Sequence, residues 1–471
     1  MNLTFFHDVK KFTRSVKILT LLAFFLCSTE GYGSDVARLE SLINASLPKN
    51  AQWSYSAVNM ATGETMSSIG NAKGSSLAPA SLMKLLISAI ALENASQLHR
   101  DTIIASDGEV SQGILKGDLY IIGKGNPYLA SGDLTTVFKG LTSFGIHEIS
   151  GDIIADDSLF DSKGIERTRY GPAYAIPDAL GLDLHTVSVN VYPTKSGKPP
   201  IVEIDPPQKD IKIALSARTV SSSQITLQIR QLDDFSYQIS GNIPENSPLS
   251  HKRFPLGYPS LYAAGSLYTF LNNGGIKIKG DFKKGIAPEK AKALVSLPAP
   301  SIPETIDAMN KNSINVVADN LLLTIGAHKF GKPGTREKGV SAIRDFLQQM
   351  YMDLTGVHIV DGSGLSKENR LTSEFVARFL FKVSGKEWFE ALYKSLSVPG
   401  EGTLSHIGYK NNGFRVKTGQ LEDAFALAGY YKNNQGIGIA FAYIVNTPGA
   451  DAPSVQKTGL EILKYIAGDT V

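Results

Sequence analysis

Three short motifs in this chain combine residue types that can turn a hydroxyl group into a nucleophile. In sequence order they are Ser81-x-x-Lys84, Ser313-x-Asn315 and Lys417-Thr418-Gly419. A serine and a lysine three residues apart share one face of a helix. An unprotonated lysine amine can then take the serine proton, so that the hydroxyl attacks a carbonyl. The motifs therefore indicate acyl-transfer chemistry at Ser81.

Each motif recurs elsewhere in the chain, so context has to select among the copies. The other copies are Ser46–Lys49, Ser454–Lys457, Ser188–Asn190, Ser240–Asn242 and Lys457–Gly459. Pro48 disfavours a helix at the first of these. Ser81, by contrast, stands at the start of a long apolar helix, where the helix dipole favours negative charge on its oxygen. Lys417 precedes a strand pattern whose edge can line a cleft, whereas the second Lys-Thr-Gly leads into a helical pattern.

Composition narrows the function class. The chain has 471 residues, 42% hydrophobic and 19% charged, as is usual for a globular protein. Its formal charge of +3 falls to about +1 without the first 33 residues, which leaves no strong field for nucleic acid. The eight histidines show no metal-binding spacing. Cys27 is the only cysteine and lies in the leader, which excludes a thiolate site in the mature chain. No metal and no cofactor are expected.

Residues 1–33 read as a secretory signal peptide. Basic residues at 10, 11, 14 and 17 precede an apolar stretch, residues 18–27, that is too short to span a bilayer. Small residues before Ser34 predict cleavage there, and a retained anchor is the alternative interpretation. The mature chain has no second apolar span, so any membrane contact is expected to be peripheral.

The elements that position the motifs come from both ends of the chain, which predicts an α+β fold. A helix is expected over residues 35–46, and strands over 53–59, 65–69, 414–416, 424–430 and 437–445, followed by a C-terminal helix. These form one antiparallel sheet between helices. The segment after residue 100 is rich in short β-branched runs with turn residues, which predicts inserted β units. We expect a first domain of 34–100 and 290–471, a second of 101–185 and 251–289, and a nested third of 186–250.

The three motifs together resemble those of the penicilloyl-serine transferases. The long insertion, with the string Asp361–Ser366 and the Gly151–Phe160 region, makes the chain similar to the class C low-molecular-mass penicillin-binding proteins, the D-alanyl-D-alanine carboxypeptidase/endopeptidases. The resemblance covers the whole mature chain. It implies a DD-peptidase/β-lactamase-like domain, with a central antiparallel sheet flanked by helices and two nested mostly-β insertions. It also implies action on peptidoglycan stem peptides and cross-links in the periplasm of a bacterium, and inhibition by β-lactams.

The resemblance also assigns a role to each motif residue. Ser81 attacks the carbonyl of the penultimate D-alanine, Lys84 is the general base, Ser313 relays a proton to the leaving group, Asn315 orients Lys84 and the substrate amide, and Lys417 supplies positive potential. Thr418 binds the substrate carboxylate, and Gly419 allows close backbone approach. The N–H groups of Ser81 and Gln420 would form the oxyanion hole, where the loss of one donor costs roughly 3 kcal/mol.

Three positions depart from the family pattern or carry a weaker expectation. Gln420 stands where the family usually has serine or threonine, and Lys367 stands where arginine is common. If position 367 grips a carboxylate of the peptide, lysine offers a point charge in place of a bidentate fork. Asp156 is expected either to contact the amino end of a diaminopimelate side chain or to serve as a plain turn residue.

Two other functions compete with this interpretation. A class A β-lactamase needs a deacylating glutamate, usually in a Glu-x-x-Leu-Asn string, and this chain has none. A non-catalytic peptidoglycan-binding protein would not need an intact serine and lysine, yet both are present. Covalent labelling by penicillin distinguishes the enzyme from the binding protein, and rapid penicillin turnover distinguishes the lactamase.

Overall fold

The computed structural model describes residues 36–161, 165, 174–405, 407–433, 436–448 and 452–469. The expected signal peptide, residues 1–33, lies outside this described part. Within the described ranges, no helix has both the length and the apolar character that crossing a membrane requires. The same residues contain no group of three or more His, Cys, Asp and Glu that could hold a metal ion.

Segments from both ends of the chain form one antiparallel sheet, in agreement with the predicted fold class. In spatial order its strands are β2 (Thr65–Ile69), β1 (Gln52–Asn59), β22 (Gly436–Asn446), β21 (Ala424–Asn433) and β20 (Phe414–Leu421). Side chains alternate between the faces of each strand. In β21, Phe425 and Leu427 pack on the side of α11 (Ala452–Ala467), whereas Ala426 and Ala428 belong to the opposite core. These small residues leave room for the turn that contains Ser81, which contacts β20 and β21.

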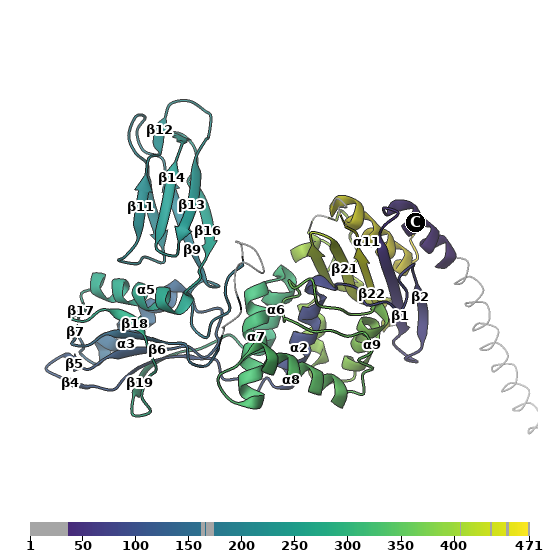
Figure 1. Cartoon of the computed structure of the whole chain (residues 1–471), viewed down its shortest axis with the longest axis horizontal. Coiled ribbons are helices and arrows are strands. Elements are labelled where there is room, and N and C mark those ends of the chain that lie inside the picture. The colour runs from purple at the N-terminus through teal and green to yellow at the C-terminus, as the bar shows by residue number, and fades with distance from the viewer. Residues whose placement is uncertain are drawn as a thin grey trace, which may run out of the picture.

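Six helices join that opposite core. They are α2 (Met83–Glu93), α6 (Ile302–Asn312), α7 (Asn315–Phe330), α8 (Arg336–Gln349), α9 (Ser373–Val383) and α10 (Phe389–Ser395). Helix α2 lies in the middle of this group (Figure 1) and is buried at every position except Glu93. A helix that is apolar on all sides can be stable only when other elements surround it. The continuous apolar run after Ser81 thus places the candidate nucleophile at the centre of the domain.

A second unit contains two sheets. In the first sheet the strand order is β17 (Lys277–Ile278), β7 (Glu148–Ile149), β5 (Ile114–Lys116) and β4 (Glu109–Ser111). In the second sheet it is β18 (Phe282–Lys284), β8 (Ile153–Asp156), β6 (Leu119–Ile122), β3 (Thr102–Ser106) and β19 (Lys292–Leu297). Helices α3 (Leu134–Ser143) and α5 (Pro259–Asn273) pack against these sheets. Neither helix was predicted from the sequence. In α5, Ala263, Leu267 and Leu271 recur every four residues, and all three lie in the shared core.

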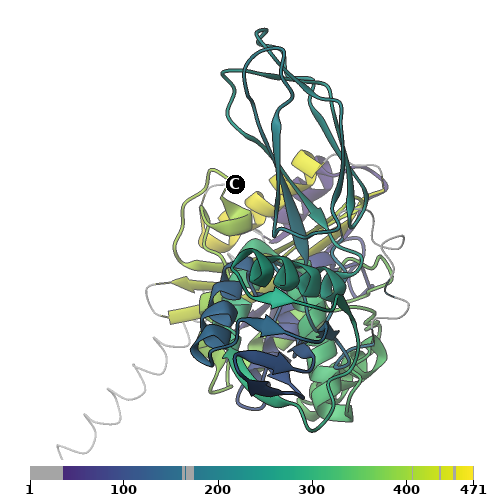
Figure 2. The same cartoon turned by 90° about the vertical axis from the view of Figure 1, so that its left-hand side faces the viewer.

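A third unit consists of strands and projects from the second as a long finger (Figures 1 and 2). Its strands are β9 (Thr186–Tyr192), β10 (Ile201–Asp205), β11 (Lys212–Leu215), β12 (Arg218–Val220), β13 (Gln228–Asp233), β14 (Ser236–Ser240), β15 (Asn242–Pro244) and β16 (Ser250–Pro255). In β9, Val187, Val189 and Val191 are fully buried and alternate with half-buried polar residues, as expected for a strand with one core face.

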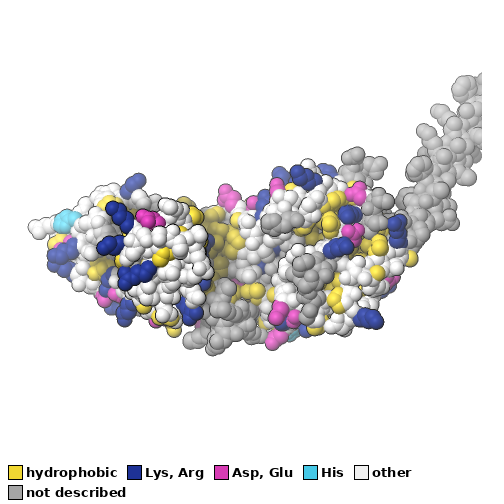
Figure 3. All heavy atoms as spheres, turned by 90° about the horizontal axis from the view of Figure 1, so that it is seen from above, with side chains coloured by type: hydrophobic (Ala, Val, Ile, Leu, Met, Phe, Trp, Pro, Cys, Tyr) yellow, Lys and Arg dark blue, Asp and Glu magenta, His cyan; other side chains and the backbone are white. Residues whose placement is uncertain are grey.

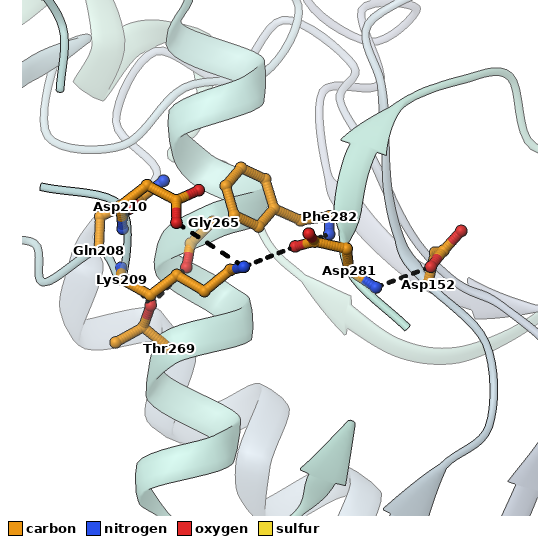
Figure 4. Close-up of polar contacts among 8 residues, drawn as sticks. All are labelled: Asp152, Gln208, Lys209, Asp210, Gly265, Thr269, Asp281 and Phe282. Atoms are coloured by element: carbon orange, nitrogen blue, oxygen red, sulfur yellow. Dashed lines mark hydrogen bonds and ion pairs between the residues drawn. The ribbon is translucent and has the colours of Figure 1, made fainter. Parts of the chain in front are cut away.

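Lys209 fastens this finger to the second unit (Figure 4). Its Nζ lies 2.8 Å from a carboxylate oxygen of Asp281, immediately before β18, and 3.7 Å from Asp210. Its backbone N–H donates to Thr269 Oγ1 on α5 at 2.9 Å. Asp281 in turn donates its N–H to Asp152 Oδ1 at 2.8 Å. Contacts to a helix and to a strand therefore hold the finger at its base.

A hollow separates the base of the finger from the helices of the first unit. This cavity of about 540 Å³ is lined by Tyr174, Ala175, Leu184, Thr186, Lys252, Arg253, Phe254, Pro255, Ile314, Asn315 and Val316. The view from above shows hydrophobic side chains in this recessed region (Figure 3). Because Asn315 also lines the cavity around Ser81, the hollow borders the candidate active site.

Candidate active site

Ser81 occupies a short 3-10 turn, η1 (Ala80–Leu82), immediately before α2. The expected helix start is thus a tighter turn that leads into the helix. Ser81 is half-buried and lines a cavity of about 470 Å³ together with Ser313, Asn315 and Thr418. Residues from all three sequence motifs therefore meet at one cavity.

Lys84 is fully buried, and its amine has three oxygen neighbours. Nζ lies 2.8 Å from Ser81 Oγ, 2.7 Å from Asn315 Oδ1 and 2.7 Å from the backbone oxygen of Ser363. The amide and backbone oxygens can only accept hydrogen bonds. A neutral amine would use its two hydrogens on them and turn its lone pair toward the Ser81 hydroxyl. This is the arrangement that a general base needs.

Burial lowers the pKa of Lys84 to about 8, although the Asp319 and Asp361 carboxylates act in the opposite direction. Burial and the charge of Lys84 also hold the pKa of Lys417 well below its usual value. Two buried amines near each other disfavour a second positive charge. The site thus favours a state in which at least one of the two lysines is neutral at a mildly alkaline pH.

The second motif forms the turn between α6 and α7. Ser313 has a left-handed backbone, with a φ of 53°, and ends α6, while Asn315 begins α7. This turn directs both side chains into the Ser81 cavity. Ser313 Oγ accepts a hydrogen bond from Lys417 Nζ at 3.1 Å. The turn therefore connects the Ser81–Lys84 pair to the third motif.

The third motif lies on the edge strand β20, with Lys417 fully buried. A Cβ atom added to Gly419 would come within 2.9 Å of Pro79 O and of Ser81 N, which explains the need for glycine beside the Ser81 turn. Thr418 Oγ1 donates to Thr403 Oγ1 at 2.6 Å, and both threonines line the cavity. The Gln420 amide oxygen accepts from Gln456 Nε2 at 3.1 Å.

The two weaker candidates lie apart from these contacts. Both carboxylate oxygens of Asp156 accept backbone N–H groups, from Ser158 at 2.9 Å and from Ala287 at 2.8 Å. The first contact is local to the turn after β8, and the second joins this turn to a segment that is distant in the sequence. Lys367 Nζ pairs with Asp423 at 2.7 Å and with Glu422 at 3.3 Å, and its side chain is 58% exposed. Neither residue lines the Ser81 cavity, and their substrate contacts stay predictions.

Three residues of the site were not identified from the sequence. The backbone oxygen of Ser363 contacts Lys84, Thr403 contacts Thr418, and Asp319 binds the 362–363 backbone. Asp319 follows Asn315 by one helical turn, so a carboxylate on the same helix face was a readable signal. A backbone carbonyl and a threonine from a distant loop leave no such signal.

Gly364 packs so tightly against the Ser81 turn that we expect Gly364→Ala to impair both stability and acylation. Its φ is +83°, and an added Cβ would lie 1.8 Å from Ala80 O. We expect the free energy of unfolding to fall by about 3 kcal/mol or more. Denaturant unfolding and the rate of penicillin acylation measure the two effects.

Gly74→Ala is the matched control, because Gly74 has a similar φ of +72° but nothing within 4 Å of an added Cβ. Backbone strain should lower its free energy of unfolding by only about 1 kcal/mol, and its acylation rate should be that of the wild type. Equal losses of stability in the two variants would contradict the importance of the close approach.

Comparisons with known proteins match this chain to one family and to solved structures of the same fold. Residues 36–465 match the D-Ala-D-Ala carboxypeptidase 3 (S13) family. The D-alanyl-D-alanine carboxypeptidase of Actinomadura sp. (strain R39) is 28% identical, over 86% of this chain and 79% of that protein. The D-alanyl-D-alanine carboxypeptidase DacB of Haemophilus influenzae is 24% identical, over 91% and 92%. The crystal structure of penicillin binding protein 4 (dacB) from Haemophilus influenzae has a TM-score of 0.75 at 22% identity, over 90% of this chain and 99% of that one. A second structure of that protein holds a β-lactam, with a TM-score of 0.73.

Proposed function

This chain belongs to the D-Ala-D-Ala carboxypeptidase 3 (S13) family of serine-type hydrolases, and on that premise we propose that Ser81 is its nucleophile and Lys84 its general base. The substrates are the D-alanyl-D-alanine ends and the cross-links of peptidoglycan stem peptides. The observation that carries the assignment is the buried Lys84 amine, which lies 2.8 Å from Ser81 Oγ and contacts two further oxygens that can only accept.

Acylation begins when Ser81 Oγ attacks the carbonyl carbon of the penultimate D-alanine and gives its proton to Lys84 Nζ. The C–N bond to the terminal residue then breaks. The proton taken by Lys84 moves by way of Ser313 Oγ to the leaving nitrogen, so Lys84 is neutral again. The products of this step are an ester on Ser81 and a free amine. Water then attacks the ester, which releases the shortened peptide and restores the Ser81 hydroxyl.

The same acylation step serves two substrates that differ in their leaving amine. A terminal D-alanine leaves in the carboxypeptidase reaction, and the side-chain amine of a neighbouring stem leaves when a cross-link is cut. In the first case, Thr418 binds the free carboxylate of the leaving residue and Lys417 supplies positive potential. A charged partner of this kind stabilises the ammonium form of Lys417, and that charge in turn favours a neutral Lys84.

The cellular setting follows from the substrate and from the N-terminal segment. We propose that residues 1–33 direct the chain to the periplasm of a bacterium, where peptidoglycan is accessible. Penicillin is expected to acylate Ser81 and to persist as the adduct, an expectation supported by the β-lactam held by the Haemophilus influenzae relative.

The proposal is tested with two substrates and one label. Purified protein should release D-alanine from a stem pentapeptide that ends in D-alanyl-D-alanine, and should convert cross-linked muropeptide dimers to monomers. Prior treatment with penicillin should block both reactions and leave one covalent adduct, seen by mass spectrometry. Fast penicillin turnover without D-alanine release would instead identify a β-lactamase, and the absence of both adduct and product would identify a binding protein.

A further inference from the structure

Asp319 is a buried carboxylate on α7, one helical turn after Asn315, and the mechanism above does not use it. The residue as a whole is 4% exposed. Oδ1 accepts the backbone N–H of Gly362 at 2.9 Å and that of Ser363 at 3.0 Å. Oδ2 accepts the hydroxyl of Tyr174 at 2.6 Å. Three donors from two separate segments thus converge on one carboxylate, which a buried charge needs in order to be tolerated.

The backbone that Asp319 holds is the one that contacts the catalytic pair. The Ser363 carbonyl accepts from Lys84 Nζ at 2.7 Å and from Ser81 Oγ at 3.4 Å. The two N–H groups on Asp319 belong to the same short stretch as this carbonyl, so they set its direction. Rotation of this stretch would remove one of the two acceptors that leave the Lys84 lone pair turned toward Ser81.

Tyr174 brings a segment of the inserted part of the chain into this network. Its hydroxyl donates to Asp319, and Asn320, the next residue on α7, donates its side-chain amide to the backbone oxygen of Asp178 at 3.0 Å. Two adjacent residues of α7 therefore hydrogen-bond to two residues of the segment that precedes the finger. Only Asp319 and the backbone of residues 362–363 lie between Tyr174 and Lys84 in this chain of hydrogen bonds.

We propose that Asp319 is a positioning residue for Lys84, which it orients through the Ser363 carbonyl, and that Tyr174 fixes Asp319 from the inserted part of the chain. The inference rests on the proposed function, since it assumes that Lys84 is the base for Ser81.

The charges around Asp319 give the proposal a measurable signature. Lys84 and Asp361 are the charged groups that act on it, Lys84 in turn interacts with the charge of Lys417, and the Tyr174 hydroxyl donates a hydrogen bond. The Asp319 carboxylate raises the pKa of Lys84. Removing that charge while keeping an oxygen for the Gly362 and Ser363 N–H groups should lower the pKa of Lys84. The rising limb of acylation against pH, which reports the neutral amine, should then move to lower pH.

The experiment measures the second-order rate of acylation by a fluorescent penicillin from pH 6 to 10 in full-length variants. Asp319→Asn keeps an oxygen for the two N–H groups, so its limb should move down by about one pH unit while its plateau rate falls less than about tenfold. Asp319→Ala loses the acceptor, so its plateau rate should fall by about a hundredfold. The plateau rate of Tyr174→Phe should fall by roughly three- to tenfold.

Asp234→Asn is the matched control. Asp234 is also buried and accepts backbone N–H groups, from Gly257 and Tyr258, but it lies in the finger. It should keep both the wild-type rate and the wild-type limb, whatever it does to the melting temperature. If Asp319→Ala does not fold, Asp319→Asn and Tyr174→Phe carry the test.

The outcomes separate the two levels of inference. Folded Asp319 variants that match the wild-type rate and limb, beside a wild type that forms the adduct, would overturn the positioning role alone. A wild type that forms no adduct on Ser81 would overturn the proposed function and this inference with it. A limb that moves in Asp319→Asn and stays in Asp234→Asn supports the positioning role.

Discussion

Ser81→Ala is expected to abolish covalent labelling by penicillin and to reduce D-alanine release by roughly 10⁵-fold or more. The serine oxygen is the only group proposed to form a bond with the substrate, so no other side chain can replace it. The substitution removes one half-buried oxygen and should leave the fold intact. Intact-protein mass spectrometry after incubation with penicillin, with D-alanine release measured in parallel, checks the result.

Ser46→Ala is the matched control, because Ser46 and Lys49 repeat the Ser-x-x-Lys pattern at an exposed position outside the Ser81 cavity. It should label at the wild-type rate. An adduct that persists in Ser81→Ala, or one that is lost in Ser46→Ala, would contradict the choice of nucleophile.

Replacement of Lys84 should separate base catalysis from charge. Lys84→Met fills the buried space with an apolar chain, and the acylation rate should fall by roughly 10²- to 10⁴-fold. Lys84→Arg keeps a positive charge but cannot lose its proton near neutral pH, so it should be impaired to a similar extent. Stopped-flow acylation at pH 9 measures both rates, and circular dichroism checks that each variant is folded.

The pH dependence of the wild-type acylation rate tests the same role of Lys84. The pKa of Lys84 is lowered by burial to about 8, so the amine is largely protonated below pH 7 and largely neutral above pH 9. Acylation should therefore rise with pH through about 8. The residual rates of Lys84→Met and Lys84→Arg should lack this limb. A limb that persists in both variants would assign the titration to another group.

The catalytic motifs and the principal sheet could be predicted from the sequence because local patterns encode them. The apolar run after Ser81 predicts a buried helix, and the alternation around Phe425 and Leu427 predicts a strand with two different faces. The five strands expected from both chain ends all occur, with the later ones extended by a few residues. Helices α3 and α5 of the second unit were not assigned, since apolar runs there read equally well as strand.

The contacts of side chains with distant backbone could not be predicted in the same way. Asp156 carries the right chemistry for an amine ligand, yet its carboxylate binds two backbone N–H groups, one of them from Ala287 in a distant segment. Lys367 likewise meets Asp423 on the turn after β20. No local pattern announces such partners, because they depend on how remote segments are packed.

The sequence by itself determined the chemistry of this protein: a serine and a lysine on one helix face, followed by two motifs whose residue types suit acyl transfer. Only the tertiary structure decided how that chemistry is held in place. It brings the Ser363 carbonyl to Lys84, Asp319 to the backbone of that carbonyl, and Tyr174 to Asp319. The physical reason is that residue types and short spacings follow from local order. The pKa and direction of the Lys84 amine, in contrast, depend on burial and on hydrogen bonds from segments far away in the chain.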